Sequence, residues 1–274
     1  MRSRIREYLS EDIGSGDITS ELVVPATQRA KGRIVAKETC VHAGATEAAQ
    51  VFEELGAKAV QKRKDGSYVE KGDVVMTVSG PARALLAGER LALNFIMRMS
   101  GIATVTRGLA EMCREVNPEV RVAATRKTVP GFREFEKRAV ALGGGDPHRF
   151  GLHDSVLIKD NHIRIAGGVR EALRRARKSS FTKKVEIEVE NEKDAFAALE
   201  AGADIVMLDN FPPAEAGRLY RALKKRRPDI VVEVSGGITP ANIRGYAGAA
   251  DIISVGWITH SVRSADFSME MEKA

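Results

Sequence analysis

The sequence predicts an α/β protein in which a mixed α/β domain precedes a β/α barrel. Short apolar, β-branched segments alternate with helical segments from about residue 119 to residue 255, as expected for parallel strands joined by crossover helices. Polar residues follow the carboxyl end of one strand after another, and such ends meet on one face of a barrel. An open doubly wound sheet is the alternative, but it would be accompanied by a dinucleotide glycine fingerprint after its first strand, and the sequence has none.

Length and composition describe a folded protein of one or two domains. The chain has 274 residues, of which 43% are apolar and 29% charged. No apolar run approaches the ~20 residues of a membrane span, and the amino-terminal segment lacks the apolar core of an export signal. Cys40 and Cys113 lie far apart and in no metal-ligand spacing, which is typical of a reducing compartment. We therefore expect a cytoplasmic protein that does not enter a membrane.

The net charge of +6 is compatible with binding of nucleic acid or of strongly anionic small molecules. Two basic clusters, at 174–178 and 224–227, fall where predicted helices end, and cations there face the negative end of the helix dipole. Neither cluster is interleaved with aromatic residues or belongs to a nucleic-acid-binding motif. We therefore expect no nucleic-acid partner.

Residues 1–103 are predicted to form the first domain. A helix at the amino terminus, a strand-like segment at 29–44 and a helix at 45–55 lead to residues 64–80, whose two glycine-containing turns indicate a hairpin. Apolar spacing predicts helices from Pro81 to Met99 and from about Thr104 to Val116, separated at Gly101.

Residues 104–258 are predicted to form the second domain, which contains the alternating pattern. Its predicted strands are 121–125, 155–158, 184–190, 204–208, 230–234 and 251–255, and its later helices are 132–142, 166–178, 192–201, 213–226 and 240–248. Six strands are fewer than the eight of a complete barrel. The tail, 259–274, has amphipathic spacing that predicts a helix packing back on the first domain.

Cationic side chains gather in the first part of this domain. Arg126 and Lys127 end one predicted strand, Lys159 ends the next, and His148 and Arg149 lie in the glycine-rich loop between them. Guanidinium and ammonium groups are the usual donors to carboxylates and phosphates. Their convergence on one rim predicts a pocket for several anions.

Glycine-rich turns follow the last two predicted strands, at Ser235-Gly236-Gly237 and at Val255-Gly256. Such turns expose backbone N–H groups to a phosphate in many barrels, although each could also be only a tight turn. Because the two turns occur as a pair, a phosphate site is the favoured interpretation.

Two carboxylates, Glu188 and Asp209, end neighbouring strands among these cations. They are predicted either to bind Mg²⁺ or ribose hydroxyl groups, or to form ion pairs with Lys127 or Lys159. Glu186 and Glu190 alternate with Glu188, and we expect at least one of them to pair with a lysine.

Longer motifs strengthen this interpretation. The segments TRKTVPG, GGGDPHRFGLHD and KDNH occur in this order between Thr125 and His162, and GERLALNFIMRMSGIAT, EIEVEN, MLDNF and EVSGGI lie outside them. In these motifs the chain resembles quinolinate phosphoribosyltransferase, also called nicotinate-nucleotide pyrophosphorylase (carboxylating), over nearly its whole length. The resemblance implies an α/β sandwich domain followed by an incomplete β/α barrel, the type II phosphoribosyltransferase arrangement.

The resemblance also implies substrates and residue roles. Quinolinate and phosphoribosyl pyrophosphate would react with Mg²⁺ as cofactor, giving nicotinate mononucleotide, carbon dioxide and pyrophosphate for NAD biosynthesis. Lys127, Lys159, Glu188 and Asp209 would be catalytic, and Lys127 would contact pyrophosphate. Arg126, His148, Arg149 and Lys159 would recognise carboxylates, joined by Arg90 from the neighbouring subunit of a homodimer or larger homo-oligomer. Further substrate contacts would come from Thr125, Ser235, Gly236, Gly237, Val255 and Gly256.

Two positions depart from the family pattern. Arg138 stands where an aromatic residue is common, and Pro147 where asparagine is frequent. Because proline fixes its own φ and restricts Asp146, the loop that carries His148 could be set differently. A related subgroup associated with molybdenum transport therefore stays as an alternative, as does a barrel enzyme acting on another phosphorylated sugar. The complete cation set and the KDNH segment favour the quinolinate enzyme.

Overall fold

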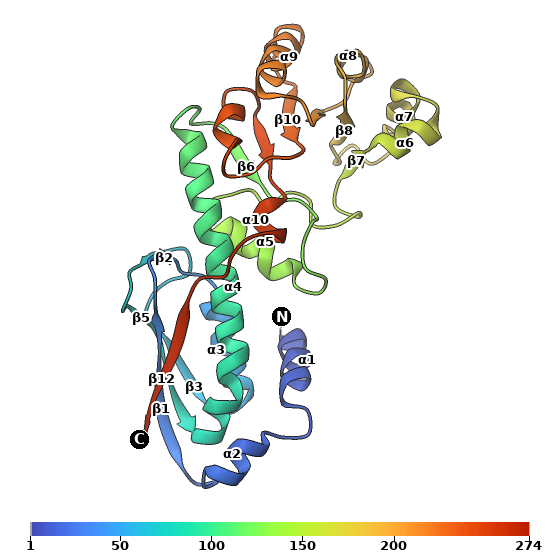
Figure 1. Cartoon of the computed structure of the whole chain (residues 1–274). Helices are drawn as coiled ribbons and strands as arrows, with labels where there is room; N and C mark the ends of the chain where they lie inside the picture. Colours follow the sequence, from blue (N-terminus) through green and yellow to red (C-terminus); the bar gives the residue numbers. More distant parts are fainter. Residues whose placement is uncertain (1, 274) are drawn as a thin grey trace. The chain divides into compact units, whose positions relative to one another are not determined.

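The computed structural model describes residues 2–273, which fold into two compact units (Figure 1). The first unit contains the chain up to Val105, residues 141–143 and the chain from Val262 onward, and the second contains 106–140 and 144–261. None of the described helices combines the length and apolarity that crossing a bilayer requires.

The first unit is built on a four-stranded antiparallel sheet. The strand order is β12 (Phe267–Lys273), β1 (Arg29–Ala36), β5 (Val74–Pro81) and β3 (Lys58–Gln61). The helices are α1 (Arg2–Ile13), α2 (Ile18–Val23) and α3 (Ala45–Glu54), of which α3 packs on β3 and α1 packs on α3. The predicted helix at 45–55 is confirmed, and Val51 and Phe52 on its buried face are fully shielded from solvent.

The predicted hairpin at 64–80 is wrong. β4 (Tyr68–Val69) pairs with β2 (Cys40–Val41) in a separate small sheet, whereas β5 pairs with β1 and β3. The glycine turns are present, with Gly66 and Gly72 at positive φ, but they connect strands of different sheets. Local turn signals therefore located the turns without determining which strands pair.

A single helix, α4 (Ala82–Arg114), replaces the two helices predicted on either side of Gly101. Gly101 is buried, and a β-carbon there would overlap the backbone carbonyl of Arg263. Glycine is thus required for a close backbone approach and does not end the helix. Ile96, Met99 and Ile102 are completely buried around it, and this packing outweighs the weak helix propensity of glycine.

The carboxyl-terminal residues form a strand, and the helix predicted within 259–274 is wrong. β12 pairs with β1 along its whole length, and Figure 1 shows the two side by side although they come from opposite ends of the chain. Phe267, Met269 and Met271 alternate with polar residues, which is the period of a strand. Ala274, the last residue of the predicted helix, lies outside the described residues.

The second unit is built on a six-stranded parallel sheet that curves as an incomplete barrel. The strand order is β6 (Arg121–Ala123), β11 (Ile252–Ser254), β10 (Val231–Ser235), β9 (Ile205–Asp209), β8 (Val185–Val189) and β7 (Val156–Ile158). All six predicted strands are confirmed. The first two strands of the unit, β6 and β7, stand at the two edges, so the order is that of a barrel left open between them.

Most predicted helices of this unit are also present, namely α5 (Arg133–Leu142), α8 (Glu192–Glu200) and α9 (Pro213–Arg226). The helix predicted at 166–178 is present as α7 (Val169–Ala176), and a further helix, α6 (Asp160–Ala166), precedes it across Gly167 and Gly168, both at positive φ. The helix predicted at 240–248 is only a 3₁₀ turn, η1 (Ile243–Tyr246). There the Asn242 side chain accepts from the Thr239 N–H at 2.8 Å, and such side-chain bonds compete with helix formation.

The basic clusters lie at the carboxyl ends of α7 and α9, as predicted, and several of their members make intramolecular contacts. Arg174 and Arg175 both bind Glu171. Lys224 donates to the Ile230 carbonyl at 2.6 Å. These contacts explain the clusters within the fold itself.

Candidate active site

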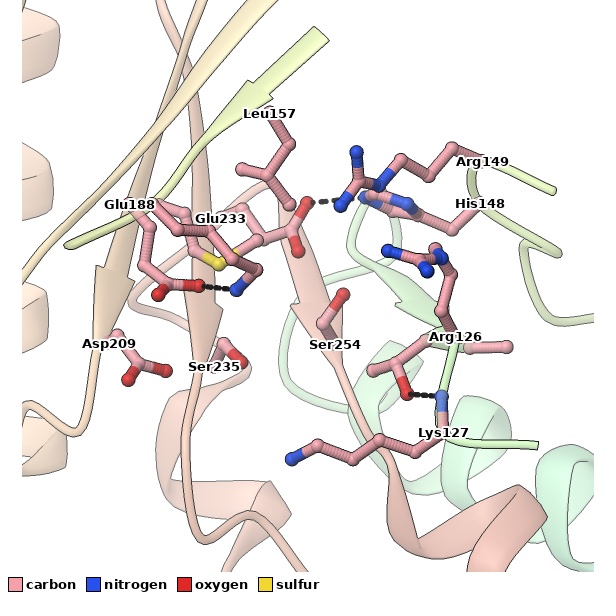
Figure 2. A pocket seen from close by; sticks show the side chains of 14 residues that line it. Arg126, Lys127, His148, Arg149, Leu157, Glu188, Asp209, Glu233, Ser235 and Ser254 are labelled. Atoms are coloured by element: carbon pink, nitrogen blue, oxygen red, sulfur yellow. Dashed lines mark hydrogen bonds and ion pairs between the residues drawn. The ribbon is translucent and has the colours of Figure 1, made fainter. Parts of the chain in front are cut away.

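A cavity of about 330 Å³ opens at the carboxyl ends of the six parallel strands (Figure 2). This volume is in the range of small-molecule sites. Five of the six strands and the segment that follows β6 contribute to its wall, which consists of Ala124, Thr125, Arg126, Lys127, His148, Arg149, Leu157, Lys159, Glu188, Met207, Asp209, Glu233, Ser235 and Ser254. Nine residues singled out from the sequence thus line one cavity: Thr125, Arg126, Lys127, His148, Arg149, Lys159, Glu188, Asp209 and Ser235.

Arg126 and Arg149 enter the cavity from the same side (Figure 2). The Nε of Arg126 is buried and has no hydrogen-bond partner among the described residues. Burial, and next the charge of Arg126, lower the pKa of Arg149. A buried unpaired donor beside a second guanidinium is an arrangement that an anionic ligand would stabilise.

Glu188 and Asp209 lie on the opposite side of the cavity (Figure 2). Glu188 forms an ion pair with Lys159, so the predicted ion-pair alternative is confirmed for this carboxylate. Asp209 accepts a hydrogen bond from the Asn210 side chain at 2.7 Å. The backbone N–H of Lys159 donates to His162 Nδ1 at 2.9 Å, which caps α6 and fixes the point from which the lysine side chain starts.

The turn after β11 lies against Lys127. A β-carbon on Gly256 would approach the Lys127 Cδ to 2.9 Å, and the Thr259 hydroxyl donates to the Lys127 carbonyl at 2.6 Å. The Lys127 N–H in turn donates to the Thr125 hydroxyl at 3.0 Å. Glycine at position 256 therefore makes room for the lysine stem.

The other predicted turn residues lie outside the cavity wall. Gly236 and Gly237 follow Ser235 with φ of 91° and 59°, and a β-carbon on Gly236 would overlap Asn210. Val255 is fully buried, and its N–H donates to the Ala123 carbonyl at 2.8 Å. At Gly236 the tight turn alone requires glycine, so contact with a phosphate stays a prediction there.

Arg90 lies on α4 in the part that belongs to the first unit, and its side chain is exposed. Its action on a neighbouring subunit therefore stays a prediction.

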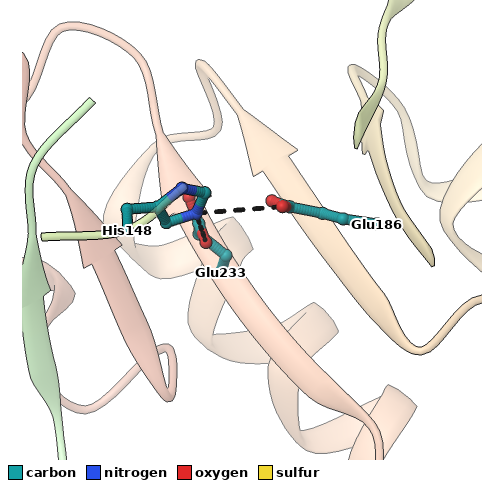
Figure 3. A group of neighbouring side chains, drawn as sticks. All are labelled: His148, Glu186 and Glu233. Atoms are coloured by element: carbon teal, nitrogen blue, oxygen red, sulfur yellow. Dashed lines mark hydrogen bonds and ion pairs between the residues drawn. The ribbon is translucent and has the colours of Figure 1, made fainter. Parts of the chain in front are cut away.

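Two buried glutamates, Glu186 and Glu233, were not predicted as site residues, and Glu233 is part of the cavity wall. His148 Nε2 lies 3.2 Å from Glu233 Oε2 and 3.8 Å from Glu186 Oε2 (Figure 3). At least one of Glu186 and Glu190 is expected from the sequence to pair with a lysine, and Glu186 lies against this histidine instead. Burial, and next the charge of Glu233, raise the pKa of Glu186 to about 9. Glu233 precedes Ser235 by two residues, so the strand period could have placed both on the cavity face.

The donor set suits a hard divalent cation as well as anions. Glu188 and Asp209 direct carboxylates into the cavity from neighbouring strands, and Ser235 adds a hydroxyl group. Mg²⁺ is commonly bound through one or two carboxylates together with phosphate oxygens and water. The residues present therefore fit a magnesium ion that arrives with a phosphorylated substrate.

A parallel β/α barrel with cations, carboxylates and glycine turns at its strand ends defines an enzyme of phosphorylated, anionic substrates. Sequence profiles described as "Quinolinate phosphoribosyl transferase, C-terminal domain" and "Quinolinate phosphoribosyl transferase, N-terminal domain" match residues 102–270 and 17–100. The chain belongs to the quinolinate phosphoribosyltransferase family.

Individual relatives cover almost the whole chain. The probable nicotinate-nucleotide pyrophosphorylase (carboxylating) of Methanothermobacter thermautotrophicus is 46% identical over 275 residues, which is 99% of each chain. The protein of the same name from Archaeoglobus fulgidus is 47% identical over 93% of this chain and 98% of its own. The solved nicotinate-nucleotide pyrophosphorylase of Francisella tularensis is 36% identical, with a TM-score of 0.92 over 99% of this chain and 97% of that one.

Proposed function

We propose that the protein transfers the phosphoribosyl group of phosphoribosyl pyrophosphate to quinolinate and releases pyrophosphate and carbon dioxide. The product is nicotinate mononucleotide, a precursor in NAD biosynthesis. One observation carries the proposal: in a chain of this family, a single cavity combines two arginines for a dicarboxylate with Lys127, Glu188 and Asp209 for a phosphorylated sugar.

Quinolinate recognition is assigned to Arg126, His148, Arg149 and Lys159. The planar guanidinium groups can each donate two parallel hydrogen bonds to a carboxylate. Lys159 must exchange its ion pair with Glu188 for the substrate, at least in part, and this exchange leaves Glu188 available to the ribose or to Mg²⁺. Binding of both substrates therefore replaces the ion pair between Lys159 and Glu188 with contacts from each residue to a ligand.

Transfer requires the pyridine nitrogen to meet the anomeric carbon of the ribose as the bond to pyrophosphate breaks. The sugar gains cationic character and the leaving group gains negative charge. Lys127 neutralises part of that charge, and Glu188 and Asp209 would hold Mg²⁺, which supplies the rest. Most of the rate enhancement then comes from alignment and charge complementarity.

Decarboxylation follows from the charge on the ring. Once the nitrogen is alkylated and positive, the adjacent carboxylate leaves as carbon dioxide, and its bonding electron pair stays on the ring carbon until a proton arrives. The positive nitrogen stabilises this carbanion, so no side chain needs to act as a covalent nucleophile. Isolation of an intermediate covalently attached to the enzyme would contradict this mechanism.

We also propose a homodimer, or a larger homo-oligomer, in which Arg90 enters the partner's active site, and a cytoplasmic location. The exposed position of Arg90 on α4 and the two buried, unpaired cysteines support these assignments. Mixing Arg90→Ala subunits with subunits inactivated at Lys159 tests the first. Restored activity in the mixed oligomer is expected, because one of its sites has both residues, whereas activity no greater than in either parent would contradict it.

The direct test of the reaction is formation of nicotinate mononucleotide and pyrophosphate with quinolinate, phosphoribosyl pyrophosphate and Mg²⁺ present or singly omitted. Product should require all three. A folded protein that binds phosphoribosyl pyrophosphate but leaves quinolinate unchanged would refute the proposal and favour the molybdenum-associated subgroup.

A further inference from the structure

The loop that carries His148 has an unusual backbone. Among residues 2–273, His148 and Asn210 are the two non-glycine residues with positive φ, and that of His148 is 54°. A side chain in this left-handed region carries a steric cost, which persists only where the surrounding structure imposes it. We therefore expect specific hydrogen bonds to fix the peptide group between Pro147 and His148.

Two groups hold that peptide group, one at each end. Its N–H, which belongs to His148, donates to the Asp146 carboxylate at 2.7 Å. Its carbonyl, which belongs to Pro147, accepts from the ammonium group of Lys137. Rotation about the N–Cα bond of His148 begins at this peptide plane, so these two contacts set the φ of His148.

Lys137 is placed to act on the loop and not on a ligand. It lies on α5, is only 4% exposed, and is not part of the cavity wall. Burial, and next the charge of Arg133, lower its pKa to about 8. Burying a lysine is unfavourable unless its ammonium group forms a hydrogen bond or an ion pair, and here that group donates to the Pro147 carbonyl.

The imidazole ring of His148 is held by two glutamates, independently of the contacts that hold its backbone. Its Nε2 faces Glu233 and Glu186, so Nδ1 is the ring nitrogen left for a ligand. These three ligand atoms lie within 4.8 Å of one another, which resembles a metal site. The hydrogen bond to Glu233 and the nearby Arg149 account for the same arrangement without an ion.

We propose that Lys137 is a positioning residue for quinolinate: through the Pro147 carbonyl it fixes the backbone of His148 and thereby directs the imidazole at the acid substrate. This role rests on the proposed function and extends it to a residue outside the cavity. It also gives Pro147, a departure from the family pattern, a consequence. Proline has a fixed φ and no N–H, so its carbonyl is the only backbone group of Pro147 that can form a hydrogen bond with a side chain of α5.

A double-mutant cycle of Lys137→Met and His148→Ala tests the proposal, with KM measured for both substrates. Because small misplacements of a binding group can cost up to about a hundredfold, we expect Lys137→Met to raise KM for quinolinate about tenfold, with little change in KM for phosphoribosyl pyrophosphate. In the His148→Ala background the same substitution should change KM for quinolinate less than about twofold, since it acts through His148. Lys137→Arg, which keeps a donor, should recover part of the loss.

Lys224→Met is the matched control. Lys224 also donates to a backbone carbonyl in the same unit, that of Ile230, but at the amino end of β10. It should lower stability without changing KM for quinolinate.

Three outcomes would overturn the role of Lys137: additive effects in the cycle, an equal rise in KM for both substrates, or the same kinetic change in the Lys224 control. If Lys137→Met does not fold, Lys137→Arg takes its place in the cycle, with the same criterion of additivity. Wild-type turnover of quinolinate is measured first. Its absence would refute the proposed function, whereas turnover with additive effects would refute only the positioning role.

Discussion

At the scale of single residues, the cavity contains cationic and anionic side chains whose hydrogen bonds and ion pairs would change when substrate binds. Arg126 keeps a buried Nε without a hydrogen-bond partner among the described residues, while Lys159 and Glu188 neutralise each other. Unsatisfied buried donors cost stability, and fold stability alone does not explain keeping one. A carboxylate or phosphate group of the proposed substrates would supply the missing partner.

Substitution of Arg126 by lysine should separate charge from shape. Lysine keeps the positive charge but loses the planar fork, so we expect KM for quinolinate to rise roughly 10- to 100-fold, with KM for phosphoribosyl pyrophosphate nearly unchanged. Steady-state kinetics with each substrate varied in turn measures both. An unchanged KM for quinolinate would remove Arg126 from acid recognition.

Glu186 gives a prediction about pH and stability. Its pKa is about 9 in the folded protein, against an ordinary value of 4.5, so between these values the folded state holds a proton that the unfolded state has released. Stability contributed by this proton is present at low pH and is lost as the pH rises towards 9. Glu186→Gln cannot ionise, and its stability relative to wild type should therefore increase from pH 5 to pH 9.

Urea unfolding at a series of pH values measures this difference. Glu190→Gln is the control, because Glu190 is exposed just beyond the end of β8. A difference between Glu186→Gln and wild type that stays flat across the range would contradict the raised pKa.

At the scale of elements, α4 shows why glycine is an ambiguous signal. Gly101 and Gly108 lie in the same helix, yet Gly101 is buried against the Arg263 carbonyl and Gly108 has nothing within 4 Å of a built β-carbon. The sequence around Gly101 has no feature that distinguishes close packing from a helix break. The distinction depends on residues more than 150 positions later in the chain.

The two glycines should respond to alanine in opposite directions. Gly108→Ala should stabilise the protein by about 1 kcal/mol, the difference in helix propensity. Gly101→Ala should destabilise it by about 1–3 kcal/mol or more, because the added methyl group displaces a backbone segment. Thermal or urea unfolding checks both, and a stabilising Gly101→Ala would show that the approach of Arg263 is not constrained.

At the scale of the whole molecule, features that depend on neighbouring residues in the sequence were predicted correctly, whereas pairings between distant segments were not. The six barrel strands were predicted within about two residues because buried parallel strands are short, continuous apolar runs. The strand β12 was missed because seven alternating residues can also be read as an amphipathic turn of helix, and its partner β1 lies at the other end of the chain. The pairing of β4 with β2 was missed because the two strands have only two residues each and are separated in the chain by α3 and β3.

The candidate site divides in the same way. Side chains at strand ends, such as Lys159 and Asp209, could be assigned to one rim from strand periodicity alone. The contact of His148 with Glu233 spans 85 positions, and the bond from Lys137 passes through a backbone carbonyl, so neither leaves a motif in the sequence. Family resemblance supplied roles for Lys159, Asp209 and His148, but not for Glu233 or Lys137.

The most direct test of the account uses quinolinate labelled in one carboxyl group at a time. With phosphoribosyl pyrophosphate and Mg²⁺ present, carbon dioxide should carry label only from the carboxyl group next to the ring nitrogen, with one pyrophosphate formed for each carbon dioxide. Omission of phosphoribosyl pyrophosphate should abolish release, because the nitrogen must be alkylated first. Release from the other carboxyl group, release without the sugar donor, or no release by a folded protein would contradict the account.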